Sequence, residues 1–65
     1  MILRVTVDGD DKFLDTDEIT IDEWADVVKR FGVSWARFNP WASPSEAKAA
    51  RHLIVTHLGV PAELL

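Results

Sequence analysis

Apolar and polar residues alternate along the start of the chain. Within residues 2–7 the apolar positions share one face and the polar ones the other, Leu3, Val5 and Val7 against Arg4 and Thr6. A period of two over β-branched residues predicts a half-buried strand. Asp8-Gly9 is a frequent hairpin turn, and Lys12-Phe13-Leu14 is the expected returning strand. We predict a hairpin over about residues 2–15, with a loop of two to five residues that leaves the pairing register open.

Two helices are predicted next, because each carries local start and stop signals. Thr20 and Glu23 form a capping box, with Ile19 able to pack on Trp24 as a hydrophobic staple. Ser43-Pro44-Ser45-Glu46 repeats the box, with proline at the first helical position. Gly32 and Gly59, each followed by valine, are typical left-handed helix ends. The helices should therefore cover about residues 21–31 and 44–58.

Each predicted helix carries an apolar stripe at helical spacing. In the first the stripe consists of Ile21, Trp24, Val27, Val28 and Phe31. In the second it consists of Ala47, Ala50, Ile54 and Leu58, with Leu53 at its edge. These stripes are the expected buried faces, and the small alanines would let a neighbouring element approach closely.

Together these elements predict one small α+β domain over residues 1–65, of order β-β-α-α. The hairpin should pack on two antiparallel helices. An aromatic connector, residues 33–42, joins the helices, and an apolar tail, residues 61–65, should dock on the domain or continue into a further segment.

Composition narrows the class of protein. With 65 residues and 48% hydrophobic content the chain can fill one small core, burying about 60% of its unfolded surface. It has no cysteine, which excludes disulfides and thiolate metal sites. No apolar run approaches the ~18 residues of a membrane span, and the start lacks the layout of a secretory signal. We expect a cytoplasmic protein without a membrane partner.

The net charge of −4 is unevenly distributed. Residues 1–26 carry nine acids against two bases, whereas residues 27–65 carry five bases against two acids. Such a bipolar surface suits head-to-tail association or docking on a basic partner, although a solvated acidic face is the simpler interpretation. The scattered bases do not form the dense stripe that phosphate binding needs, so nucleic acid is not an expected partner.

Candidate catalytic and metal-binding patterns fail on spacing. Asp8, Asp10 and Asp11 lack the glycine and glutamate positions of a calcium loop. His52 and His57 are five residues apart, so on a helix they point about 140° from each other. We expect His57 near the apolar arc and His52 pointing outward, both structural. No catalytic, metal or cofactor site is predicted, and the chain is not expected to be an enzyme.

The connector contains the remaining candidates, Trp35, Arg37, Phe38 and Trp41. The favoured interpretation is that its rings fold back and complete the small core. The alternative is a protein-binding surface, because tryptophan and arginine dominate interface hot spots; one ring inside and one outside would combine the two. Asp10 and Asp11 at the hairpin tip are further protein-binding candidates.

Several of these features together resemble a known family. The hairpin, the phrase Ile-Thr-Ile-Asp-Glu-Trp at residues 19–24, the Gly-Val-Ser-Trp helix end at residues 32–35 and a second helix follow one another. Over roughly residues 5–60 the chain resembles the N-terminal region of tail assembly chaperones of long-tailed bacteriophages (siphophages).

The resemblance implies a non-enzymatic, cofactor-free assembly factor in the host cytoplasm. Such a factor coats the tape measure protein while the tail tube polymerises, so the implied partner is a tape measure protein, or the chain itself as an oligomer. Two alternatives stay open: a structural virion protein (capsid or tail decoration), and a small adaptor or inhibitor that docks its acidic hairpin on a host protein.

Overall fold

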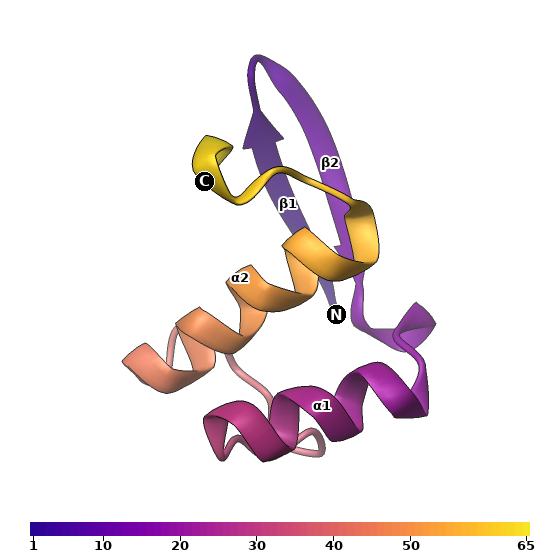
Figure 1. Cartoon of the computed structure of the whole chain (residues 1–65), viewed down its shortest axis with the longest axis vertical. Helices are drawn as coiled ribbons and strands as arrows, with labels where there is room; N and C mark the ends of the chain where they lie inside the picture. The colour runs from indigo at the N-terminus through magenta and orange to yellow at the C-terminus, as the bar shows by residue number, and fades with distance from the viewer.

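A computed structural model describes residues 1–65, and its elements follow the predicted β-β-α-α order. The two strands are β1 (Ile2–Val7) and β2 (Asp10–Asp15), and the two helices are α1 (Ile21–Phe31) and α2 (Pro44–Leu58) (Figure 1). Two short 3₁₀ turns that the pattern did not predict, Thr16–Glu18 and Ala62–Leu64, follow β2 and α2. The α+β fold class is confirmed. None of the helices has the length and apolar character needed to cross a membrane.

The hairpin has the shortest of the loops left open by the sequence. Val7 pairs with Asp10, so only Asp8 and Gly9 form the loop, with φ of 54° and 86°. Positive φ at both positions is the geometry that matches the twist of the flanking strands. The register places Leu3 opposite Leu14, and both side chains are buried. The returning strand is longer than predicted, because it pairs along its whole length, Asp10–Asp15.

The helix ends form as their residues predict, with one exception. Thr20 Oγ1 accepts from the Glu23 N–H at 3.2 Å, and the Glu23 carboxylate accepts from the Thr20 N–H at 3.1 Å. Ser43 Oγ likewise accepts from the Glu46 N–H at 3.2 Å. However, the Glu46 carboxylate accepts from the N–H of Asn39 at 2.6 Å, so the predicted second capping box is only half formed. The Glu46 side chain, which would complete the box, binds the connector instead.

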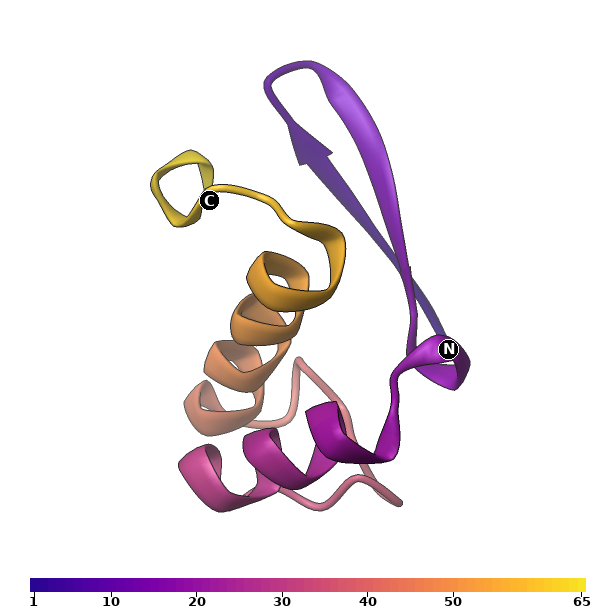
Figure 2. The same cartoon turned by 45° about the vertical axis from the view of Figure 1, so that its right-hand side comes forward.

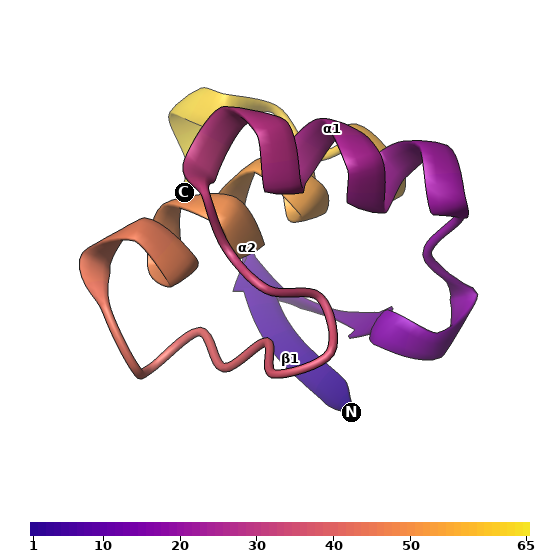
Figure 3. The same ribbon diagram turned by 90° about the horizontal axis from the view of Figure 1, so that it is seen from below.

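Helix α2 is the central element of the fold. It contacts β2 on one side and α1 on another, and it lies between the hairpin and α1 in Figures 1 and 2. The two helices run in roughly opposite directions, and the connector passes from the end of α1 to the start of α2 (Figure 3). The core collects side chains from every element, and the most deeply buried are Leu14, Val27, Ala49 and Leu53.

The predicted buried faces need correction on both helices. On α1, Trp24 and Val27 are buried, but Ile21 is 83% exposed and Val28 is 37% exposed. On α2 the buried residues are Ala49, Ala50, Leu53 and Ile54, whereas Ala47 is exposed and Leu58 only half-buried. The reason is the number of neighbours. Two elements cover α2, which widens its buried face, while α1 has one main helical neighbour, which leaves part of its apolar stripe outside.

Candidate functional site

The connector divides its three aromatic rings between the core and the surface. Phe38 is buried, and its ring meets that of Trp24 edge to face, with centroids 5.3 Å apart. Trp35 and Trp41 are 63% and 77% exposed. The core interpretation is therefore wrong for both tryptophans. Phe38 was also predicted as a protein-binding residue, but the fold encloses its ring.

Two polar contacts hold the connector around Phe38. The N–H of Asn39 donates to the Glu46 carboxylate at 2.6 Å, and the Asn39 side-chain oxygen accepts from the N–H of Trp41 at 3.0 Å. Because Glu46 belongs to the first turn of α2, the turn after Phe38 is tied to a rigid element. This fixes the direction in which the chain leaves the core.

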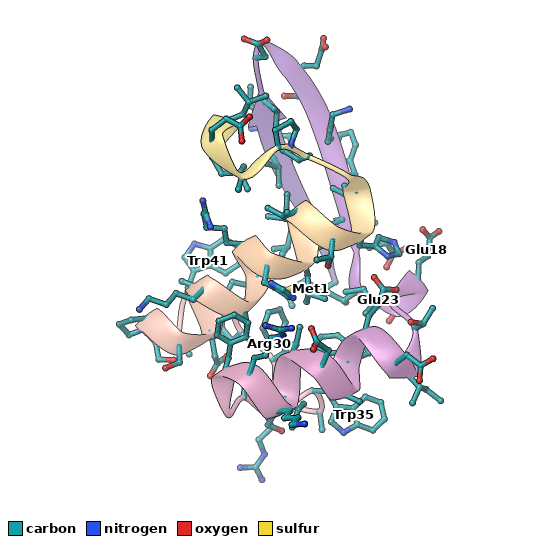
Figure 4. All side chains as sticks on the ribbon, viewed as in Figure 1. Met1, Glu18, Glu23, Arg30, Trp35 and Trp41 are labelled. Atoms are coloured by element: carbon teal, nitrogen blue, oxygen red, sulfur yellow. The ribbon has the colours of Figure 1, made fainter.

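The remaining predicted binding residues are exposed but do not form one surface. Figure 4 shows Trp35 on the side of α1 that faces away from α2, and Trp41 well apart from it, beside the first half of α2. Arg37 is exposed in the connector. Asp10 and Asp11 lie exposed at the hairpin tip, at the far end of the molecule from α1, and Asp11 accepts from the Thr6 hydroxyl at 2.8 Å.

Trp35 instead joins the outer face of α1. Together they line an open hollow of about 400 Å³ whose lining residues are all hydrophobic: Ile21, Trp24, Ala25, Val28 and Trp35. A smaller hollow of about 270 Å³ shares Ile21, Trp24 and Trp35 and reaches Asp17 beyond the start of the helix. We call the five residues of the larger hollow the α1 groove.

The α1 groove has the properties of a binding surface for apolar groups. Ile21, Ala25 and Val28 are spaced i, i+4 and i+7, which places them in one row along the helix. The fold does not bury this row, since Ile21 and Ala25 are both exposed. Contiguous exposed apolar surface is a common feature of interaction sites on small proteins. The sequence contains a signal for this surface, because the apolar stripe of α1 is too wide for one neighbour, but the pattern alone does not separate the exposed part of the stripe from the core.

The opposite face of α1 is tied to α2 by two histidine–carboxylate pairs that the sequence did not reveal. His57 Nδ1 lies 2.9 Å from a Glu23 carboxylate oxygen, and His52 Nε2 lies 3.0 Å from one of Asp26. The prediction that His52 points outward is wrong, because it faces α1. Around the axis of α2, the buried residues Ala49 and Leu53 fall in the arc between the two histidines. The histidines therefore flank this buried face, and both can reach α1.

Both carboxylates in these pairs have lowered pKa values. The pKa of Glu23 lies below 4.5, chiefly because the backbone N–H of Thr20 donates to it, with His57 adding to the effect. The pKa of Asp26 lies below 3.8, chiefly through its hydrogen bond with Arg30, with a further contribution from His52. Hydrogen bonds to the charged form account for both directions. These groups hold the helices together and lie outside the α1 groove.

The groove therefore offers burial of apolar surface, and its side chains carry no proton-transfer group. No set of three or more histidine, aspartate or glutamate side chains is arranged to hold a metal ion. Comparison with known proteins finds no matching protein family, no matching curated protein and no matching solved structure.

Proposed function

We propose that this chain is a non-enzymatic protein-binding module, and that the α1 groove receives an apolar helical segment of its partner. The supporting observation is the exposed row of Ile21, Ala25 and Val28 beside Trp35. A row with i, i+4, i+7 spacing matches the way an amphipathic helix is read by a groove. Tryptophan at the rim supplies the large, rigid contact area that dominates interfaces.

We further propose that the partner is a tape measure protein and that the chain acts as a tail assembly chaperone. The sequence resemblance over residues 5–60 supports this assignment. Two physical features agree with the role: an apolar groove can cover apolar segments of an unassembled partner, and the acidic residues 1–26 would keep the complex in solution.

The apolar surface of the α1 groove limits the binding free energy that one groove can contribute. Fully burying a large apolar side chain contributes about 1.5–3 kcal/mol. Ile21, Val28 and Trp35 are 83%, 37% and 63% exposed, so together they can add on the order of 3–5 kcal/mol. A Kd of 1 mM corresponds to about 4 kcal/mol. One groove alone therefore binds weakly, which suits reversible coating of a long partner by many copies.

Co-expression with a tape measure protein tests the proposal. The wild-type chain should co-purify with the tape measure protein and raise its soluble fraction. Ile21→Asp should abolish both effects with little loss of stability, because an acidic residue is favoured in the first turn of a helix. Trp35→Ala should also abolish them. Trp41→Ala is the matched control, since it removes an equally exposed tryptophan outside the groove.

Other outcomes would contradict the chaperone assignment in distinguishable ways. Failure of the wild-type chain to co-purify removes its main support. Finding the chain in purified virions at fixed copy number would instead indicate a structural component. If charge reversal at Asp10 and Asp11 abolishes binding while Ile21→Asp does not, the acidic hairpin is the docking surface and the groove is not.

A further inference from the structure

The outer edge of β1 carries unpaired backbone groups. Residues that flank a two-residue hairpin loop form a hydrogen-bonded pair, and such pairs then alternate along the ladder. The Val7–Asp10 pair is therefore hydrogen-bonded, and the bond from the Thr16 N–H to the Met1 carbonyl at 2.9 Å shows the same phase at the other end. The N–H and C=O groups of Ile2, Arg4 and Thr6 consequently point away from β2.

Nothing else in the chain satisfies these groups. No backbone hydrogen bond outside the helices and the strand pair involves Ile2, Arg4 or Thr6, and no side chain bonds to their backbone. All three residues are exposed. The C-terminal segment crosses in front of the hairpin and ends beside β1 (Figure 1), but none of its backbone groups bonds to β1.

The two edges of the hairpin differ in how they are protected. Natural proteins block exposed edges with charges, prolines or bulges. Along β2, Asp-Asp-Lys-Phe-Leu-Asp, four of the six residues are charged. Along β1, Ile-Leu-Arg-Val-Thr-Val, only Arg4 is charged, and the strand contains no proline and pairs without a bulge. The outer edge of β1 can therefore pair with another strand, whereas the charged residues of β2 disfavour pairing at its outer edge.

We propose that β1 pairs antiparallel with β1 of a second copy, centred on Val5, to give a four-stranded sheet of order β2-β1-β1-β2. In this register Arg4 faces Thr6 of the other copy, and Leu3 faces Val7. The two symmetric Arg4–Thr6 pairs supply about four new backbone hydrogen bonds. Centring on Arg4 would place two like charges directly opposite each other, which is destabilising.

The symmetric register also continues the buried face of the sheet. Opposite residues in an antiparallel pair lie on one face, so Leu3, Val5 and Val7 of both copies share the face that α2 covers. A two-stranded sheet is marginal in water, whereas three or more strands with an apolar face are stable. A second copy is the occupant because the strand is complementary to itself in this register. This dimer forms without the tape measure protein.

Solution mass and a single cysteine test the dimer. The full chain should run at twice its mass of 7.3 kDa in light scattering and sedimentation at high concentration, and dissociate on dilution. The chain has no cysteine, so Val5→Cys introduces a unique thiol. In the proposed dimer the two Cα atoms of residue 5 are about 4.5 Å apart, within disulfide range. Mild oxidation should give a covalent dimer.

Lys12→Cys is the matched control, because Lys12 lies opposite Val5 on the other strand of the same hairpin. In the proposed sheet the two copies of residue 12 are three strand spacings, about 14 Å, apart and cannot form a disulfide. A monomer at every concentration would overturn the proposal. So would a dimer in which Val5→Cys fails to cross-link, or cross-links no better than Lys12→Cys.

Proline substitutions give a second, independent test. Arg4→Pro removes an N–H that faces the open edge and leaves the hydrogen bonds to β2 in place, so it should make the chain monomeric. Phe13→Pro removes the corresponding N–H from the outer edge of β2 and should leave the dimer intact. A proline variant that loses its far-UV circular dichroism signal has unfolded. In that case the cross-linking yields of Val5→Cys and Lys12→Cys decide whether the dimer forms. A dimer that withstands Arg4→Pro with its fold intact would contradict the pairing.

Discussion

Truncation of Phe38 should destabilise the fold far more than truncation of either exposed tryptophan. Phe38 is 9% exposed and stacks edge to face on Trp24. Replacing a buried phenylalanine by alanine costs about 3–5 kcal/mol. At about 0.05–0.15 kcal/mol per residue, a chain of 65 residues has a total stability of roughly 3–10 kcal/mol. Phe38→Ala should therefore remove about a third or more of the total stability.

A milder variant makes the measurement quantitative. Phe38→Leu keeps most of the apolar volume and should cost less than about 1.5 kcal/mol. With a urea m-value near 1 kcal/mol/M for a protein of this size, the unfolding midpoint should fall by about 1 M. Trp41→Ala, at 77% exposure, should change the free energy of unfolding by less than about 0.5 kcal/mol.

Urea unfolding followed by far-UV circular dichroism measures all three variants under the same conditions. The expected order of destabilisation is Phe38→Ala, then Phe38→Leu, then Trp41→Ala. If Trp41→Ala lowers the midpoint as much as Phe38→Leu, the division of the connector into a core ring and surface rings is wrong. A cost below 1 kcal/mol for Phe38→Ala would refute its place in the core.

Three further predictions concern the helix ends and the interhelical pairs. The pKa values of Glu23 and Asp26 are lowered in the folded state, so both carboxylates stabilise the fold above their ordinary values of 4.5 and 3.8. That contribution is lost as the pH falls through the folded pKa values. Glu23→Gln should flatten the acid side of the Tm-against-pH curve; an unchanged curve would contradict the linkage. Gly32→Ala meets no atom within 4 Å but forces φ of 66° on a residue with a Cβ, and should cost about 1–2 kcal/mol in thermal unfolding; no loss would mean that the helix end relaxes. Ser43→Ala removes the cap of α2 and should cost about 1 kcal/mol. Ser45→Ala serves as its control, because Ser45 lies in the same first turn and takes no part in the cap bond.

The helix boundaries were predictable because their signals are local. Thr20 and Ser43 cap, and Gly32 and Gly59 adopt positive φ, within a few residues of the ends they define. The same holds for the hairpin turn, where the Asp8-Gly9 pair specified the turn but not the number of loop residues. Glu46 shows the limit of this reasoning. The local pattern predicts that its carboxylate accepts from the Ser43 N–H, but it accepts from the Asn39 N–H, which the connector brings near.

The faces and the binding surface were not predictable in the same way. Whether Ile21 is core or surface depends on how many elements cover α1, which no feature of α1 itself records. Trp35 was a candidate from its residue type, but its companions Ile21, Ala25 and Val28 were assigned to the core. The His52–Asp26 and His57–Glu23 pairs join residues 26 and 34 positions apart, respectively. They too depend on how the helices pack, which neither helix sequence specifies alone.

The central place of α2 has a consequence for how the protein is made. Both the hairpin and α1 find their main tertiary neighbour in α2, which leaves the ribosome after both of them. A lone hairpin is marginal in water, and an isolated helix of 11 residues is too short to be stable by itself. We therefore expect residues 1–43 to stay largely unfolded during translation and the domain to form once α2 has emerged. Until then the apolar residues of β1 and those of the α1 groove should be exposed together on every nascent chain.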